Sequence, residues 1–469
     1  MKKTKIICSI GPASNEPDVM EQMVNAGMNV ARINFSHATK EEKEKVVATV
    51  KEVRKRTGAN VAILYDTKGP EFRNGMLEND QITLEEGETI RVVKDEVLGN
   101  KERFSVNHPQ VLDCLEVNDV ILLENGLMKI EVVSKENDGV TCIIKTGGIL
   151  GNKKSLSIPG KKLNIPYISE KDREDIIYAC EHEADYLAIS FVSFKEEVEE
   201  VREILKEYNQ ADLPIICKIE NALGIENLDE ILEVSEGIMV ARGDLGTETC
   251  METLPLVQKE MIKKCREHGK IAIVATEMLE SMKKNARPTR AEISDVANAV
   301  LDGTDAVMLS GESTVGKYPV ETVKFMADIC EATEKNATFE GKFNYRKQFG
   351  ATQTISTCVV ESSKLMNSKL IVAATVSGFT ARKISNLKPN CLVLATCPTE
   401  NVGRRLALNW GVYPSIVPML GTTDEVISKS IEKAKEFMPL DKGDTVIVTG
   451  GFPNTGEKKT TNLMKIEEM

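Results

Sequence analysis

The stretch Pro214–Glu220, PIICKIE, decides the fold. It is an apolar run of strand length that ends in a lysine and a glutamate. Similar runs, rich in Val, Ile and Ala, recur in the first two-thirds of the chain at Lys5–Ile10, Val30–Ser36, Val61–Thr67, Tyr186–Val192, Gly237–Gly243, Ile271–Glu277 and Ala306–Glu312. Most are followed by a helix-like stretch, and strands with intervening helices in this number predict a (β/α)8 TIM barrel, an α/β fold. The polar residues at the strand ends should then converge at one end of the barrel.

Composition limits the classes of function. The 469 residues predict several domains, and the 41% hydrophobic and 28% charged content is typical of a soluble globular protein. The net charge of −12 argues against a nucleic-acid partner, and no apolar run is long enough to span a membrane. The 11 cysteines are scattered, which fits reduced thiols in the cytoplasm. The 4 histidines share no metal-ligand spacing, so a metal would be held by oxygen, as Mg²⁺ is.

The pattern of barrel strands is interrupted once. Alternating β segments with Gly, Asn and Asp turns fill residues 70–166, which predicts an all-β insertion, a small β-barrel that acts as a lid. A polar linker near Asn336–Gly350 precedes a second α/β pattern, which predicts an open, mainly parallel sheet. The expected domains are the barrel at 1–69 and 167–340, the lid at 70–166 and a C-terminal domain at 341–469.

Charged side chains at the ends of the predicted strands are the first candidates for chemistry. Lys218 and Glu220 lie two residues apart on a strand and should face the same side. They could serve as an electrostatic stabiliser and a metal ligand, although an ordinary ion pair explains them equally well. Asp244 follows a glycine exit, Arg242-Gly243, and with Glu220 would supply hard oxygen ligands for Mg²⁺; a helix N-cap is the simpler explanation of Asp244 alone.

The second and third predicted strands end in oxygen-rich segments. Arg32, Asn34 and Ser36 should share one strand face, and Asp66-Thr67 ends the next strand. Asn34, Ser36, Asp66 and Thr67 indicate a site for a monovalent cation, with a hydrogen-bonded polar layer as the alternative. Arg32 and Arg73 are phosphate-binding candidates, since guanidinium binds phosphate through two hydrogen bonds; surface ion pairing is the alternative.

Hydroxyl groups provide the remaining candidates. Thr276 ends the seventh predicted strand and could position a proton, or cap a helix. In the C-terminal domain, Thr375, Ser377, Gly378 and Thr380 join a strand to a helix start, a possible phosphate site or a plain capped helix.

Several long segments, in the same order, resemble the pyruvate kinase family over nearly the whole chain. They are Thr4–Ser14, Ala31–His37, Asp66–Glu71, Cys217–Asn221, Met239–Gly246 and Arg287–Glu292. The resemblance implies transfer of phosphate from phosphoenolpyruvate to ADP, giving pyruvate and ATP in the last step of glycolysis. It also implies the fold just described.

The resemblance assigns roles to individual residues. Lys218 would stabilise the phosphoryl group in flight, Glu220 and Asp244 would bind Mg²⁺ or Mn²⁺, and Thr276 would lie near the enolate carbon. Substrate contacts would also come from Arg32 and Gly243. The remaining assignments are Asn34, Ser36, Asp66 and Thr67 as K⁺ ligands, Arg73 as a phosphate contact, and His37, Arg73 and Lys154 as nucleotide contacts. Glu71 matches family members that need K⁺.

The resemblance further implies allosteric control and a homotetramer. The loop of Thr375, Ser377, Gly378 and Thr380 would bind a sugar phosphate or AMP. The chain departs from the family pattern at Thr247–Cys250, Glu277, Ser193 and Ser313–Val315. We expect these departures to alter substrate affinity and subunit contacts but not the reaction.

Two other functions remain as alternatives. A phosphoenolpyruvate/pyruvate lyase or aldolase would also place Glu and Asp on Mg²⁺ at strand ends, but the lid and the K⁺-type cluster argue against it. An inactive metabolite-binding regulator would not need Lys218, Glu220, Asp244 and Thr276 intact.

Overall fold

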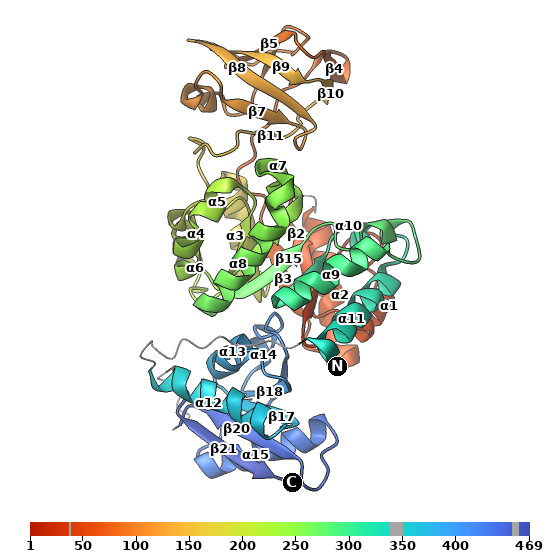
Figure 1. Ribbon diagram of the computed structural model, residues 1–469, viewed down its shortest axis with the longest axis vertical. Coiled ribbons are helices and arrows are strands. Elements are labelled where there is room, and N and C mark those ends of the chain that lie inside the picture. The colour runs from red at the N-terminus through yellow and green to blue at the C-terminus, as the bar shows by residue number, and fades with distance from the viewer. Residues whose placement is uncertain (37–38, 338–349, 453–458) are drawn as a thin grey trace.

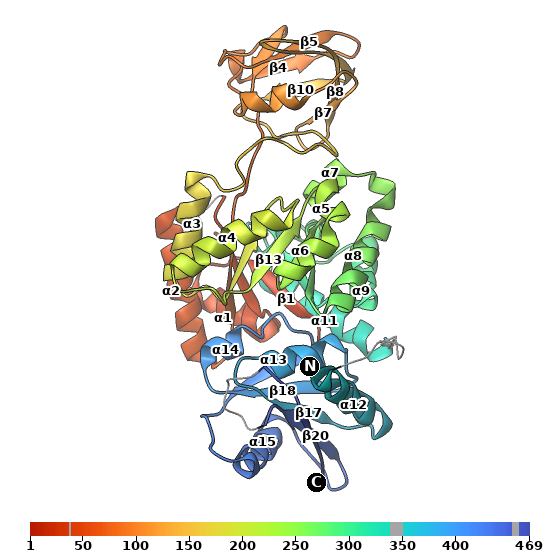
Figure 2. The same ribbon diagram turned by 90° about the vertical axis from the view of Figure 1, so that its left-hand side faces the viewer.

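The computed structural model describes residues 1–36, 39–337, 350–452 and 459–469. Three layers stack along its long axis: an all-β unit at one end, the barrel in the middle and an α/β unit at the other end (Figures 1 and 2). Most of the linker expected near Asn336–Gly350 falls outside the described residues.

A closed barrel of parallel strands forms the middle layer, as the sequence predicted. Around the barrel the order is β1-β16-β15-β14-β13-β12-β3-β2. The strands are β1 (Lys5–Ser9), β2 (Val30–Asn34), β3 (Ala62–Asp66), β12 (Tyr186–Ile189), β13 (Ile215–Ile219), β14 (Gly237–Ala241), β15 (Ile271–Ala275) and β16 (Ala306–Leu309).

Helices surround this barrel and bury the outward-facing strand residues in one large apolar core. They are α1 (Pro17–Ala26), α2 (Lys40–Thr57), α3 (Glu170–Glu181), α4 (Lys195–Glu207), α5 (Ala222–Glu226), α6 (Leu228–Val234), α7 (Arg242–Glu248), α8 (Leu254–His268), α9 (Arg290–Asp302), α10 (Gly311–Thr314) and α11 (Pro319–Asn336). Local sequence fixes several helix starts: in α2 the Thr39 hydroxyl accepts from the Glu42 amide while Glu42 accepts from the Thr39 amide. Thr289 and Glu292 repeat this reciprocal cap on α9.

The insertion between β3 and α3 is all-β, as expected. Its strands are β4 (Gln81–Leu84), β5 (Thr89–Val93), β6 (Arg103–Ser105), β7 (Val120–Leu123), β8 (Met128–Glu136), β9 (Gly139–Thr146), β10 (Gly148–Gly151) and β11 (Leu156–Ser157). A six-stranded sheet, β11-β7-β8-β9-β5-β6, and the pair β10-β4 surround a single apolar core. The sequence patterns missed β6, β10 and β11, which are short and lack a clear alternation.

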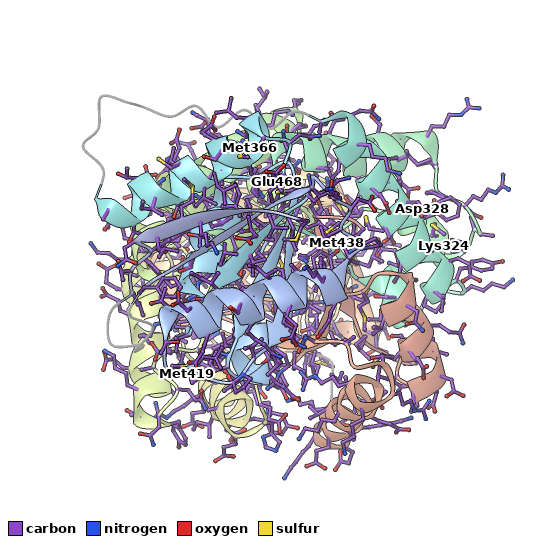
Figure 3. All side chains as sticks on the ribbon, turned by 90° about the horizontal axis from the view of Figure 1, so that it is seen from below. Lys324, Asp328, Met366, Met419, Met438 and Glu468 are labelled. Atoms are coloured by element: carbon purple, nitrogen blue, oxygen red, sulfur yellow. The ribbon has the colours of Figure 1, made fainter. Side chains whose placement is uncertain are left out.

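The C-terminal unit is an open sheet in the order β19-β18-β17-β20-β21, parallel except for the last strand. Its strands are β17 (Leu370–Ala374), β18 (Leu392–Cys397), β19 (Val412–Ile416), β20 (Thr445–Gly450) and β21 (Leu463–Glu468), and its helices are α12 (Ala351–Leu365), α13 (Phe379–Asn386), α14 (Glu400–Arg404) and α15 (Thr423–Phe437). Alternate strand residues pack against α12 and α13 on one face and α15 on the other. The view from below shows α12 and α15 on opposite sides of the sheet (Figure 3).

Buried ion pairs and hydrogen bonds join this unit to the amino-terminal end of the barrel. Asp305, just before β16, lies 2.5 Å from Lys388, and Asp185, just before β12, lies 2.9 Å from Arg404. The Lys5 ammonium on β1 donates to the Val412 carbonyl at 2.6 Å. The opposite, carboxyl end of the barrel faces the all-β insertion (Figure 2). No helix of the described chain is both long and apolar enough to cross a membrane.

Candidate active site

A polar layer caps the apolar interior of the barrel at its carboxyl end. The barrel interior is filled by Leu64, Ala188, Ile216 and similar residues. Side chains two positions further along each strand point the same way. This two-residue period therefore places Asp66, Ser190 and Lys218 next to the apolar layer, on the side of the carboxyl end of the barrel.

Lys218 lies at the centre of the polar layer. Its ammonium is 3.3 Å from Asp66 Oδ1, 3.1 Å from Glu220 Oε1, and donates to the Ser190 hydroxyl at 2.7 Å. The contact with Glu220 confirms that these two residues share a strand face. Burial acts to lower the pKa of Lys218, but the two carboxylates overcome it and raise the pKa above its usual value. The site thus holds a fixed positive charge.

Asp66 joins Lys218 to Arg32. The Arg32 Nε donates to Asp66 Oδ2 at 2.6 Å, and Arg32 also donates to the Ser9 hydroxyl at 2.7 Å. Burial acts to raise the pKa of Asp66, yet Arg32 and Lys218 hold it below its usual value. Asp66 is therefore an ionised carboxylate with no exposed surface.

The oxygen groups predicted to bind a monovalent cation lie at the ends of neighbouring strands. Asn34 and Asp66 are register partners on β2 and β3. The Asn34 side-chain oxygen accepts from the Ser36 amide at 3.0 Å, and the Thr67 hydroxyl accepts from the Ser190 amide at 3.3 Å. His37, predicted as a nucleotide contact, lies outside the described residues.

Glu220 and Asp244 face a common space. Burial raises the pKa of Glu220 to about 7; Lys218 opposes this shift, while the Asp244 carboxylate adds to it. The amide of Phe191 donates to Glu220 Oε2 at 2.7 Å and fixes that oxygen. Two carboxyl groups that repel each other in this way form a favourable place for a cation.

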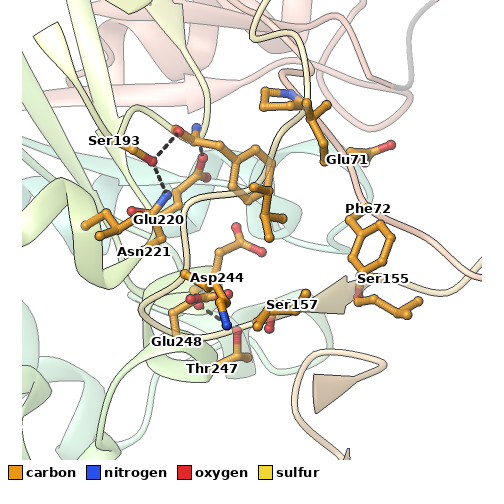
Figure 4. A pocket seen from close by; sticks show the side chains of 18 of the residues that line it. Glu71, Phe72, Ser155, Ser157, Ser193, Glu220, Asn221, Asp244, Thr247 and Glu248 are labelled. Carbon is orange, nitrogen blue, oxygen red and sulfur yellow. Dashed lines mark hydrogen bonds between the residues drawn. The ribbon is translucent and has the colours of Figure 1, made fainter. Parts of the chain in front are cut away.

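A cavity of about 460 Å³ lies between the all-β insertion and the carboxyl end of the barrel. Glu220 and Asp244 line its barrel side, and Glu71 and Phe72 face them from the segment that leads into the insertion (Figure 4). Arg73 and Lys154 also line this cavity. A partly open cavity with cationic and carboxylate walls suits a charged substrate with a bound cation.

The cationic side chains on the insertion side are held by acidic neighbours. Arg73 donates to both Glu71 oxygens, at 3.0 and 2.6 Å, and to the Lys153 carbonyl at 2.6 Å. Lys154 donates to Glu124 at 2.6 Å. Although burial acts to raise the pKa of Glu71, its hydrogen bonds to Arg73 and Lys68 keep the pKa low.

Thr276 adopts an unusual backbone conformation, with φ of +67°. Its carbonyl accepts from Arg242 at 2.6 Å, and its hydroxyl accepts from the Gly243 amide at 2.8 Å. Asp295 on α9 contacts the same guanidinium at 2.7 Å. These contacts tie Thr276 to the first turn of α7, which also carries Asp244.

The predicted effector loop lies at the carboxyl end of β17. Gly378 has φ of +80°, and the Ser377 carbonyl accepts from Arg382 at 2.9 Å. Thr375 is buried, and the Thr380 hydroxyl lies 2.9 Å from that of Thr461. The loop is distant in sequence from the polar layer and belongs to the other end of the molecule (Figure 1).

Sequence reasoning missed Ser190 and Phe191. The turn that follows β12 brings them against Lys218 and Glu220. The position of Ser190 near the carboxyl end of the predicted run Tyr186–Val192 was the available signal, because such residues gather at the active end of a barrel.

Comparisons with known proteins agree with the fold. A family model described as "Pyruvate kinase, barrel domain" matches residues 1–323, and "Pyruvate kinase, alpha/beta domain" matches residues 353–467. The chain belongs to the pyruvate kinase family. It is therefore an enzyme, a phosphotransferase that converts phosphoenolpyruvate and ADP to pyruvate and ATP.

Individual relatives are similar over almost the whole chain. A pyruvate kinase of Geobacillus stearothermophilus is 46% identical over 470 residues, which cover 99% of this chain and 80% of that protein. One from Staphylococcus haemolyticus is 44% identical over 471 residues, with the same two shares covered. The crystal structure of a pyruvate kinase from Cryptosporidium parvum superposes with a TM-score of 0.93 at 37% identity, covering 100% of this chain and 96% of that one. Membership of the family generally implies dependence on a divalent metal and K⁺.

Proposed function

We propose that phosphoryl transfer takes place in the cavity between the insertion and the carboxyl end of the barrel, beside Lys218. The observation that carries this proposal is the buried Lys218 ammonium, which lies 3.3 Å from Asp66 and 3.1 Å from Glu220, a residue that lines that cavity. In the reaction, the bond between phosphorus and the enol oxygen breaks and a bond to the terminal phosphate of ADP forms. A fixed cation at this position stabilises the negative charge of the transferring group.

The divalent cation would be Mg²⁺ or Mn²⁺, held by Glu220 and Asp244. The donor set fits, because both are hard carboxylate ligands on one cavity wall and the Glu220 pKa is raised by burial and by Asp244. Within the described ranges no cluster of three or more Asp, Glu, His or Cys side chains is arranged for a metal, so substrate oxygens would complete the coordination. When bound, the ion supplies charge neutralisation between the phosphate groups.

The monovalent cation would be K⁺, held by Asn34, Ser36, Asp66 and Thr67. This donor set fits K⁺ because it combines neutral oxygens with a single ionised carboxylate, which together suit an ion of one positive charge. Arg32, bonded to Asp66, would contribute to the substrate phosphate site from the same strand end.

The insertion would close over the cavity as a lid. Arg73 and Lys154 would then contact the phosphates of the nucleotide, with His37 at the nucleotide side. Exclusion of water by closure would limit hydrolysis of phosphoenolpyruvate. We place the limits of the units at 1–69 and 167–340 for the barrel, 70–166 for the lid and 341–469 for the C-terminal domain.

Thr276 would act at the second step, in which the enolate takes up a proton at its methylene carbon to give pyruvate. Its hydroxyl is already fixed by the Gly243 amide and donates to the Ala275 carbonyl at 2.6 Å. The adjacent Gly243-Asp244 backbone would contact the carboxylate of the substrate.

The test is pyruvate formation from phosphoenolpyruvate and ADP with Mg²⁺, with and without K⁺, for wild type and Lys218→Met. We expect turnover that requires K⁺ and falls at least a thousandfold in the variant, because about 4 kcal/mol of charge stabilisation is lost. Lys264→Met is the matched control, since Lys264 forms an exposed ion pair with Asp229 at 2.9 Å. Full turnover by Lys218→Met would refute the assignment of Lys218.

Regulation and assembly form a separate part of the proposal. Thr375, Ser377, Gly378 and Thr380 would bind the phosphate of a sugar phosphate or AMP, and the enzyme would be a cytoplasmic homotetramer. Addition of fructose 1,6-bisphosphate or AMP should lower the KM for phosphoenolpyruvate in wild type, and Ser377→Asp should abolish this response. Sedimentation would give the number of subunits.

A further inference from the structure

The turn after β12 contacts both groups of proposed cation ligands. The Ser190 hydroxyl donates to the Thr67 carbonyl at 2.7 Å and lies 3.4 Å from Asp66 Oδ1. The next residue, Phe191, donates its amide to Glu220 at 2.7 Å. Two consecutive residues therefore touch the oxygen cluster at the end of β3 and the carboxylate that directly follows β13.

The same turn holds Lys218. The Ser190 hydroxyl accepts from the Lys218 ammonium at 2.7 Å, which is shorter than either contact of that ammonium with a carboxylate. Because the hydroxyl donates its proton to the Thr67 carbonyl, its lone pairs are directed elsewhere and can accept from Lys218. Ser190 is 1% exposed, so water does not compete for this hydrogen bond.

The backbone of the turn is unusual and crowded. Phe191 has φ of +56°, a conformation that a bulky residue rarely adopts. A Cβ placed at Gly69 would lie 2.9 Å from the Ser190 Cβ, so the two chain segments are in close contact. A strained conformation persists where the surroundings impose it, and such sites concentrate near function. In this conformation the Phe191 amide donates to Glu220.

We propose that Ser190 is a positioning residue for Lys218, and that the Ser190–Phe191 turn couples the monovalent-cation site to the divalent-cation site. This inference rests on the proposed function, which assigns cation ligands on either side of the turn. A cation bound by the Asp66 and Thr67 oxygens would change the hydrogen bonds that Ser190 makes with Thr67 and Lys218. Because Phe191 follows Ser190 directly, a shift of the turn would also change the hydrogen bond between the Phe191 amide and Glu220. The two cation sites would thus be coupled through two adjacent residues, and no longer chain of contacts is needed.

The experiment compares wild type with Ser190→Ala. We expect kcat to fall about tenfold to a hundredfold, since one hydrogen bond to a charged group is lost. The K⁺ concentration for half-maximal activity should rise at least threefold, while the KM for ADP should change less than twofold. A general loss of folded protein would lower kcat without this selective change.

A binding measurement without turnover tests the coupling directly. Mn²⁺ binding is followed by electron paramagnetic resonance in saturating KCl and in tetramethylammonium chloride at the same ionic strength. In wild type, K⁺ should change the dissociation constant of Mn²⁺ at least threefold, and in Ser190→Ala this factor should approach one. An unchanged factor in the variant, or no effect of K⁺ in wild type, would overturn the inference.

Thr304→Val is the matched control, because the buried Thr304 hydroxyl donates to backbone carbonyls at the other end of the barrel. Thermal unfolding of both variants shows whether each is folded under assay conditions. If Lys218→Met retains turnover, the proposed function fails. If Lys218→Met is inactive but Ser190→Ala keeps wild-type kcat and K⁺ dependence, the inference alone fails.

Discussion

Replacing Asp295 by alanine should slow the protonation of the enolate more than it slows phosphoryl transfer. Both Asp295 carboxylate oxygens accept from Arg242 Nη1, at 2.8 and 2.7 Å, and the same guanidinium donates to the carbonyl of Thr276 at 2.6 Å. Without the carboxylate, only the Ala275 and Thr276 carbonyls and the Met278 sulfur still hold the guanidinium, so it can turn away from Thr276 more easily. The backbone of Thr276 is then no longer held in place by Arg242, and the orientation of the Thr276 hydroxyl changes with it.

The size of the effect follows from two opposing energies. A hydrogen-bonded ion pair contributes about 1.5–3 kcal/mol, and the Asp295 side chain is 34% exposed, so we take about 1.5–2 kcal/mol. The left-handed conformation of Thr276, at φ +67°, costs about 1–3 kcal/mol. The energy of the ion pair is similar to the cost of the left-handed conformation. Loss of the ion pair therefore allows the Thr276 backbone to leave that conformation. A loss of this size in the protonation transition state lowers its rate about ten- to thirtyfold.

Two assays separate the steps. Exchange of the pyruvate methyl hydrogens with deuterium from solvent, followed by proton NMR, reports the protonation step in reverse. Single-turnover formation of ATP reports phosphoryl transfer. Asp138→Ala serves as the control, since Asp138 pairs with Arg91 at 2.8 Å on the surface of the insertion. Wild-type exchange in Asp295→Ala, or an equal fall in both steps, would refute the reasoning.

Further predictions concern stability and pH. Lys388→Met should lower the free energy of unfolding by about 3–5 kcal/mol, because it leaves the buried Asp305 carboxylate without its ion-pair partner. Denaturant titration measures this free energy. The double variant with Asp305→Asn should recover part of the lost stability. In the metal-free protein, the Glu220 pKa of about 7 means that a proton competes with a divalent cation. The dissociation constant of Mn²⁺ should therefore rise about tenfold for each pH unit below 7 and level off above it; a pH-independent constant between pH 5 and 7 would contradict this.

The strands of the barrel were predictable because each is a short apolar run with a polar end, as in Pro214–Glu220. Side-chain alternation also predicted the contact of Lys218 with Glu220, since the period of a strand is a local property. Short strands such as β11 (Leu156–Ser157) were not predictable, because they are set by pairing with β7 rather than by their own sequence. The roles of the individual site residues stay predictions until the variants are measured.

The sequence by itself determined the order of strands and helices, the insertion after β3 and the chemical types at the strand ends. Only the tertiary structure decided which of those groups meet. Ser190 contacts Lys218 across 28 positions of sequence, and Asp295 contacts Arg242 across 53. Such contacts depend on the closure of the barrel, which no local pattern encodes. The shifted pKa of Glu220 has the same origin, because burial and the approach of Asp244 exist only in the folded chain.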